Sequence, residues 1–375
     1  MVSVEESFDG LGKGRRYDID WLRVIAIGLL LVYHIVIVFQ PWAAFIGFPV
    51  SKEPLEAIWP FMELLNVWRI PLLFMVSGMG VFFAIRRRSW WQLWVERSRR
   101  ILLPLIFGFF TIIPLHVIIF LKFYGEGFQY IPNPGHLWFL GNIFLYVLLL
   151  TPIFFFLKRH PNNVLFVALR LLLSLPGGVY VFVLPFVLEV LLIKPENFAY
   201  YLPPYFSNRI LGLEAFHGLL LGFLAFFLGF LLMALGKVFW RNLEGYRYTS
   251  LSVSVTLFLI RWLVFHFEGM PDILRAVESM MWILAVLAFG YRYLNRSSPA
   301  LAYLSQAAYP FYIVHMVFLY LAAFCVLQTE IPVALGFLVV IILTFGGCFA
   351  SFELLRRVGF LRPLFGMNPK RPSNL

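Results

Sequence analysis

The amino-acid sequence predicts an all-α polytopic membrane protein with about ten transmembrane helices and both termini in the cytoplasm. Of its 375 residues, 61% are hydrophobic and only 13% are charged, whereas soluble domains carry about 25% charged residues. Apolar runs of about 20 residues, the length that crosses a bilayer as a helix, recur along the chain. The basic residues gather on one side of these runs, which predicts their orientation.

Ten apolar stretches have the length of transmembrane helices. The fifth contains Pro176-Gly177-Gly178 and Pro185 and follows a possible interfacial segment at 163–173, so we expect it to be bent or broken. The ten ranges are 21–40, 60–84, 101–121, 137–157, 174–193, 212–235, 249–267, 276–294, 300–327 and 331–355.

The orientation of these helices follows from the Lys and Arg residues next to their ends. With the N-terminus inside, 22 of the 30 basic residues lie in cytoplasmic segments and five in outer segments, while Arg23, Arg69 and Arg261 lie within helices. Such an excess marks the cytoplasmic side. It also explains the net charge of +11, so we expect no nucleic-acid partner. The polar stretch 1–14 before a full-length apolar run predicts no cleavable signal peptide.

The domain organisation follows from the same pattern. We expect a cytoplasmic N-terminal tail at 1–19, one membrane domain at 20–355 and a cytoplasmic C-terminal tail at 356–375. Cys325 and Cys348 lie in apolar runs, which predicts small core residues rather than a disulfide or metal framework. The sequence has no zinc-protease His/Glu spacing, phosphate-binding glycine loop or Gly-x-Ser-x-Gly, so we expect no metal site and no ATP-driven transport.

The first apolar run carries an arginine and a histidine that face the same way. Arg23 and His34 are eleven residues apart, which is about 16 Å along a helix and roughly 20° around it. Asp20 lies three residues before Arg23, on the same face. A titratable imidazole at membrane depth is costly and is a functional candidate by default.

Two further ionisable residues are predicted deep in the membrane. Arg69 lies about nine residues into the second helix, where an arginine needs an anionic partner. That partner is either a substrate carboxylate or phosphate, or a structural carboxylate such as Glu189 or Glu63. His315 lies in the ninth helix at a depth similar to that of His34. It is either a functional residue beside His34 or a packed core histidine bonded to a backbone carbonyl, and the sequence favours neither interpretation.

Polar groups also mark both membrane faces. Arg97 and Arg100 lie at the cytoplasmic entrance of the third helix. They are three residues apart, so they share a face of the helix, and their guanidinium groups are suited to phosphate oxygens. Basic residues at such a position more commonly serve only to anchor the helix end at the cytoplasmic face. His136 and Trp138 open the fourth helix at the outer face, where aromatic residues are common in any case.

In this order and on these helices, the motifs resemble the membrane acyltransferase-3 family, and within it the group that includes glucan biosynthesis protein C. The resemblance covers most of the chain apart from about 160–300. It is carried by Asp20-Trp21-Leu22-Arg23 with His34, Trp68-Arg69-Ile70-Pro71 leading to Ser77-Gly78, Arg97 to Arg100 before Leu103-Pro104, His136-Leu137-Trp138-Phe139-Leu140, and Ser305 to His315.

The resemblance implies a multi-pass enzyme of the bacterial inner membrane. Such an enzyme moves an acyl group, usually acetyl or succinyl, from cytoplasmic acyl-CoA to a hydroxyl of an extracytoplasmic glycan. It implies no tightly bound cofactor, acyl-CoA as the donor substrate, and the lipid bilayer and a carbohydrate acceptor as partners. Because no extracytoplasmic domain is appended, we expect the outer loops at 41–59, 122–136 and 194–211 to bind the acceptor.

The resemblance also implies roles for residues on the donor side. Arg23 and His34 correspond to the family's Arg-x10-His pattern, and Arg97 and Arg100 to its Arg-x-x-Arg pattern. We expect the coenzyme phosphates at Arg97, Arg100 and Arg23, with the pantetheine arm running toward His34. His34 is then the general base on the acceptor hydroxyl, or it forms a covalent acyl-imidazole.

The remaining candidate residues serve the acceptor and the reacting carbonyl. Arg69 or His315 would stabilise the thioester oxyanion or orient the acceptor, and His136 and Trp138 would bind the acceptor.

Two other functions are compatible with the same residues. A secondary transporter of a glycan or small anion would explain ionisable residues within the membrane, and a non-catalytic scaffold would use them only to hold helices together.

Overall fold

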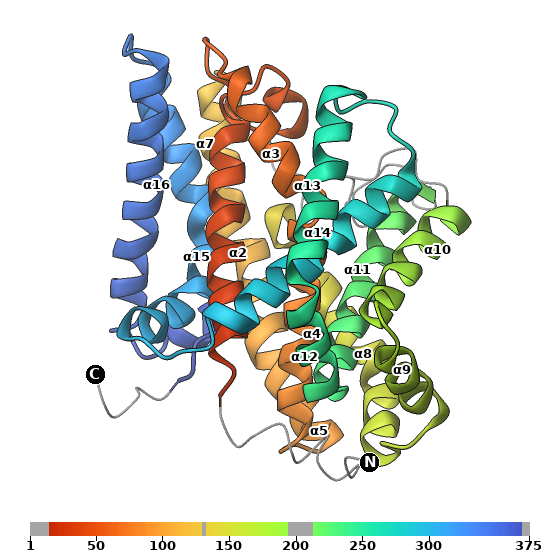
Figure 1. Ribbon diagram of the computed structural model, residues 1–375. Helices are drawn as coiled ribbons and strands as arrows, with labels where there is room; N and C mark the ends of the chain where they lie inside the picture. The colour runs from red at the N-terminus through yellow and green to blue at the C-terminus, as the bar shows by residue number, and fades with distance from the viewer. Residues whose placement is uncertain (1–14, 130–132, 194–212, 370–375) are drawn as a thin grey trace. The chain divides into compact units, whose positions relative to one another are not determined.

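Apolar helices make up the regular structure of the protein in a computed structural model, which describes residues 15–129, 133–193 and 213–369 (Figure 1). These residues contain no β-strand. The α-helices are α2 (Tyr17–Ile37), α3 (Trp59–Asn66), α4 (Arg69–Ile85), α5 (Trp90–Arg97), α6 (Leu103–Phe110), α7 (Ile112–Phe123), α8 (Trp138–Arg159), α9 (Val164–Ser174), α10 (Leu184–Ile193), α11 (Leu213–Ala234), α12 (Lys237–Gly245), α13 (Arg247–Leu263), α14 (Asp272–Tyr293), α15 (Pro299–Val326) and α16 (Val333–Leu355).

Eight helical stretches of the described residues are long and apolar enough to cross a membrane. The predicted all-α polytopic class is therefore confirmed. The fifth predicted stretch is broken as expected: α9 ends at Ser174, and a 3₁₀ turn at Gly178–Val183 leads into α10. The seventh predicted stretch is α13, a helix of 17 residues.

Two predicted transmembrane helices are interrupted. The second is divided at Val67-Trp68 into α3 and α4. The third begins with a π-helical turn, Ser98–Leu102, between α5 and α6. Pro104 explains this turn in part, because a proline cannot donate to the carbonyl four residues earlier, that of Arg100. Turns of this kind inside helices are frequent at functional sites.

The described chain separates into two compact units. The first unit contains the chain up to Arg23, Leu64–Trp94 and Leu145–Ser298. At its centre α4 packs against α11. A Cβ added to Gly78 would lie 1.9 Å from the backbone oxygen of Phe226, and one added to Gly229 would lie 1.9 Å from that of Met75. The two helix backbones therefore touch, as small residues allow in membrane helix pairs.

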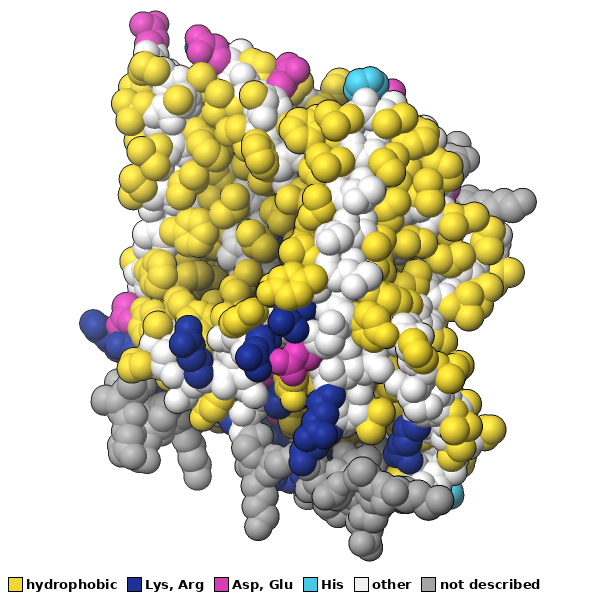
Figure 2. Space-filling view, in the orientation of Figure 1, with side chains coloured by type: hydrophobic (Ala, Val, Ile, Leu, Met, Phe, Trp, Pro, Cys, Tyr) yellow, Lys and Arg dark blue, Asp and Glu magenta, His cyan; other side chains and the backbone are white. Residues whose placement is uncertain are grey.

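The second unit contains Val24–Glu63, Val95–Phe144 and Pro299–Leu375. In it α15 packs against α16 and α7, and α2, the loop after α2 and α15 share one apolar cluster that includes Ile35, Phe39 and Leu319. Hydrophobic side chains also cover the visible outer side of α16 (Figure 2), as expected of a helix that faces lipid.

The two cysteines differ in their surroundings. Cys348 is buried, as the sequence predicts, but Cys325 is exposed and both are free thiols. The prediction of a core position for Cys325 is therefore wrong. Because α15 is apolar on all sides, its sequence does not distinguish the positions that face protein from those that face outward.

Candidate active site

A pair of stacked histidines forms the centre of the candidate site, in the second unit. α2 carries His34 and α15 carries His315. His34 Nδ1 and His315 Nε2 are 2.9 Å apart, and the two rings lie nearly parallel with centroids 5.1 Å apart. His315 is completely buried, whereas His34 is only partly buried. The structure therefore brings together two residues that are 281 positions apart in sequence.

The backbone of α15 determines which nitrogens of this pair carry protons. His315 Nδ1 lies 2.8 Å from the carbonyl oxygen of Tyr312, and because a carbonyl only accepts, Nδ1 is the donor. In a neutral imidazole the other nitrogen then holds the lone pair, so His315 Nε2 accepts from His34 Nδ1. Neutral His34 consequently has its basic lone pair on Nε2. This is the arrangement of a general base whose orientation is held by a second group.

His136 lies beside this pair at the start of the predicted fourth helix. Its ring centroid is 5.0 Å from that of His315, and its Nε2 donates to the carbonyl oxygen of Ile313 at 3.0 Å. The Tyr312 hydroxyl donates to the backbone carbonyl of His136. His136 Nδ1 therefore holds a lone pair, and this nitrogen is buried with no hydrogen-bond partner in the described residues. Buried polar atoms of this kind call for an explanation.

His116 extends the cluster to four imidazoles among the described residues of this unit. Its ring lies 5.6 Å from that of His136 and 5.2 Å from that of Tyr320, and its Nδ1 donates to the Ile112 carbonyl at 3.3 Å. The sequence indicates only an outer helix end at His116, because nothing local relates α7 to α15. In the described residues no group of His, Cys, Asp and Glu side chains has the arrangement of a metal site.

Trp138 is the first residue of α8 and is partly buried. Its ring centroid lies 6.1 Å from that of Phe139. Phe139 in turn lies 6.0 Å from Tyr312, which also faces His136. Of the two predicted acceptor-side residues, His136 lies directly beside His315, whereas Trp138 is connected to this cluster through Phe139 and Tyr312.

Arg97 and Arg100 flank the start of the π-helical turn, also in the second unit. Both approach Glu96, with the Arg100 Nε 3.3 Å and the Arg97 Nε 3.8 Å from its carboxylate. The Arg100 side chain is 45% exposed and donates from Nη2 to the Asn368 side-chain oxygen at 2.8 Å. The two guanidinium groups therefore sit together, and one of them is accessible from outside the protein.

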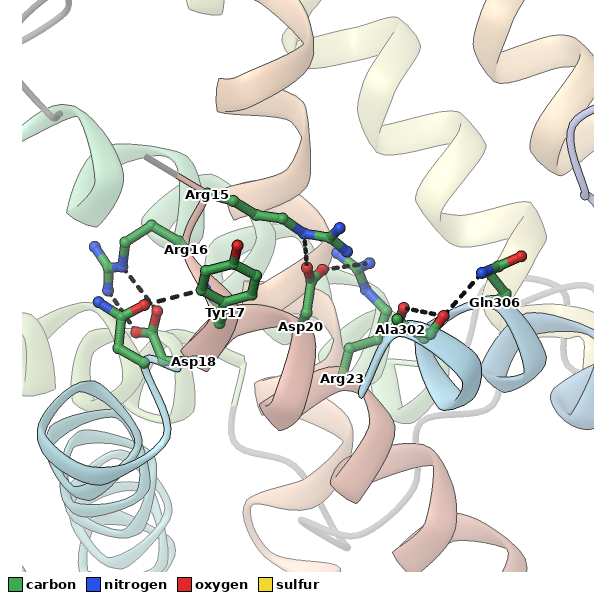
Figure 3. A network of polar contacts seen from close by, with 10 residues as sticks. Arg15, Arg16, Tyr17, Asp18, Asp20, Arg23, Ala302 and Gln306 are labelled. Atoms are coloured by element: carbon green, nitrogen blue, oxygen red, sulfur yellow. Dashed lines mark hydrogen bonds and ion pairs between the residues drawn. The ribbon is translucent and has the colours of Figure 1, made fainter. Parts of the chain in front are cut away.

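Arg23 belongs to the first unit, where it takes part in a network at the start of α2 (Figure 3). Arg15 and Arg23 both point toward the Asp20 carboxylate, at 2.7 and 3.5 Å. Beside it, Arg16 pairs with the buried Asp18 at 2.6 Å. The predicted face shared by Asp20 and Arg23 is therefore present, and Arg15 is an additional basic group there.

Arg69 also belongs to the first unit and is 1% exposed at the first position of α4. Glu189, one of its two predicted structural partners, has a different contact: both of its carboxylate oxygens lie within 2.9 Å of His217 Nδ1. A second buried pair in this unit joins Arg261 to Glu278 through two hydrogen bonds of 2.8 and 3.0 Å. The sequence does not indicate these pairs, because their partners are 17 and 28 residues apart.

The described residues form an all-helical protein with helices of membrane-spanning length, and a hydrogen-bonded pair of histidines lies at the centre of its candidate site. The family model described as acyltransferase domain, acyltransferase-3, matches residues 16–353. The chain therefore belongs to the acyltransferase-3 family and is a membrane acyltransferase. No curated protein and no solved structure matches it.

Proposed function

We propose that this enzyme moves an acetyl or succinyl group from cytoplasmic acyl-CoA to a hydroxyl of an extracytoplasmic glycan, in the bacterial inner membrane. His34 is the general base. Its Nε2 takes the proton of the acceptor hydroxyl while the oxygen attacks the thioester carbonyl. The C–S bond of the tetrahedral intermediate then breaks, and the coenzyme thiolate takes the proton back from His34.

The observation that carries this proposal is the hydrogen bond between His34 Nδ1 and His315 Nε2 at 2.9 Å. It points the basic nitrogen of His34 away from His315 and holds the ring in one orientation. When Nε2 gains a proton, the Nδ1–H bond becomes charge-assisted and stronger. His315 is therefore a positioning residue for His34, a more definite role than stabilising the oxyanion.

Two groups support binding of an acceptor hydroxyl beside His34. The lone pair of His136 Nδ1 has no donor in the described residues, and a neighbouring hydroxyl of the same sugar would satisfy it. Trp138 is partly exposed next to it. The loop at 41–59 is held close to α2 by backbone hydrogen bonds from Ser51 to Val38 and from Leu55 to Phe39. The loop at 194–211 lies outside the described residues.

Arg97 and Arg100 support the donor side, because two adjacent guanidinium groups suit phosphate oxygens. Arg23 and Arg69, in the first unit, remain proposed for the coenzyme and for the thioester oxyanion respectively. The sequence motifs resemble those of the glucan biosynthesis protein C group, and this resemblance favours a glucan-like acceptor.

Reconstitution tests this function. The full chain in liposomes, with radiolabelled acetyl-CoA or succinyl-CoA supplied at one face and a periplasmic glucan at the other, should transfer label to the glucan. Arg97→Ala combined with Arg100→Ala should abolish transfer at low donor concentration.

Arg159→Ala, at the end of α8 and outside this group, is the matched control and should retain transfer. Glucan flux without any acyl donor would instead indicate the transporter alternative. No labelled product with any acyl-CoA would contradict the proposed donor.

A further inference from the structure

The hydroxyl of Tyr309, in the second unit, takes no part in the proposed function, but its environment is unusual for a polar group. It is buried and has no hydrogen-bond partner in the described residues. A buried hydroxyl without a partner costs free energy that a phenylalanine at the same position would avoid. Tyr309 lies close to Arg100, because Gly366 packs against both the Tyr309 ring and the Arg100 carbonyl oxygen.

The chain after α16 holds Tyr309 in this position. A 3₁₀ turn, Arg362–Phe365, packs against α6, α15 and the π-helical turn. The Phe365 ring lies edge to face with Phe107, with centroids 5.4 Å apart. Gly366 follows with φ of +69°, and a Cβ there would lie 2.2 Å from the Tyr309 ring and 3.1 Å from the Arg100 carbonyl oxygen. Only glycine lets the backbone lie this close to both residues.

The same segment also orders Arg100. Asn368 accepts from Arg100 Nη2 at 2.8 Å through its side-chain oxygen. Its backbone carbonyl accepts from the buried Arg362 at 2.7 Å, and Arg362 also donates to the Arg356 carbonyl at 3.0 Å. The contact between Arg100 and Asn368 is exposed, so the neutral amide oxygen occupies a place that a phosphate oxygen would bind more strongly.

We propose that Tyr309 is a further binding residue for the anionic donor, and that residues 362–368 form part of its site. A phosphate group replaces the Asn368 side-chain oxygen on Arg100, and the Tyr309 hydroxyl donates to that same group. This inference rests on the proposed donor site at Arg97 and Arg100 and adds a neutral hydrogen-bond donor to it. It assigns part of the predicted C-terminal tail to substrate binding.

Calorimetric titration of unacylated CoA into the full chain, in nanodiscs that contain only neutral lipid, tests this assignment. Tyr309→Phe removes one hydroxyl and should weaken CoA binding by about tenfold or more. The same change should leave the melting temperature of the ligand-free protein unchanged or raised, because it removes an unpartnered buried hydroxyl. If Tyr309 has only a structural role, Tyr309→Phe should instead leave CoA affinity unchanged and lower the melting temperature.

Tyr303→Phe is the matched control, since that hydroxyl on the same helix donates to Glu353 at 2.7 Å and should not affect CoA affinity. Pantetheine, which lacks phosphate, should bind wild type and Tyr309→Phe equally. Equal CoA affinity of both proteins would overturn the assignment while leaving the donor site intact. No CoA binding by wild type would overturn both proposals. A further outcome is that Tyr309→Phe leaves CoA affinity unchanged and weakens only the binding of anionic lipid in nanodiscs that contain it. That result would assign the Tyr309 hydroxyl to a lipid headgroup and would also overturn its assignment to the donor site.

Discussion

His34 and His315 form one hydrogen-bonded pair, and the carbonyl of Tyr312 sets the proton positions on both rings. In the proposed reaction, His315 Nε2 supplies orientation and a neutral hydrogen-bond acceptor to His34 Nδ1. The sequence predicts two histidines at similar depth. It leaves open whether His315 is only a packed core residue, because the answer depends on one contact between distant helices.

Replacing His315 tests the positioning role. His315→Leu removes the acceptor for His34 Nδ1, and we expect kcat to fall about 10- to 100-fold with little change in KM, as for a lost hydrogen bond to a charged group. His315→Gln should recover part of the rate, because its side-chain oxygen can accept the same bond. Initial rates of acyl transfer measure both. His160→Gln, on an exposed histidine, is the control, and an undiminished rate in His315→Leu would contradict the role.

The rate of acyl transfer should also depend on pH. Protonation of His34 Nε2 removes the lone pair that accepts the hydroxyl proton, so kcat should decline as the pH is lowered. The measurement is the initial rate at saturating donor as a function of pH, with folding checked by size-exclusion chromatography. A rate that rises on acidification would be incompatible with a neutral imidazole as base.

At the scale of helices, the close contact of α4 with α11 is the clearest packing constraint. Gly78 and Gly229 lie on opposite helices, and each faces a backbone oxygen of the partner helix. The sequence marks Ser77-Gly78 as a motif, but only the three-dimensional contact gives the physical reason for the glycine.

Gly78→Ala should therefore lower stability by about 1–3 kcal/mol, since the added methyl meets backbone rather than a movable side chain. Thermal unfolding in detergent measures this as a lower melting temperature. Gly346→Ala is a matched control, because a Cβ at this helical glycine of α16 meets nothing within 4 Å. Equal melting temperatures of the two variants would contradict the contact.

Sequence patterns predict the long helices and the break that proline and glycine mark in the fifth stretch, but not the other irregularities. Hydropathy locates α8, α11, α15 and α16 to within two residues, because a membrane-length apolar run has few alternatives. The division between α3 and α4 and the π-helical turn are not predicted. Both depend on local backbone geometry that cannot be read from a run of apolar residues.

At the scale of the whole molecule, the candidate site residues are divided between the two compact units of the chain. The histidine cluster and the Arg97–Arg100 pair belong to one unit, and Arg23 and Arg69 to the other. Residue types and depth in the sequence indicate the four residues predicted for the donor and as the base, Arg23, Arg97, Arg100 and His34. The contact of the Arg362–Asn368 segment with Arg100 could not be predicted, because Asn368 meets Arg100 across 268 residues of sequence.

The proposed role of His34 is the proton transfer in acyl transfer from a coenzyme thioester. Its most direct test is transfer from radiolabelled acyl-CoA to periplasmic glucan by His34→Ala protein in liposomes, with CoA affinity measured on the same preparation. We expect CoA affinity to be retained and transfer to fall by a factor of about 10² to 10⁴, as for a lost general base. Transfer at the wild-type rate by folded His34→Ala protein would contradict the claim.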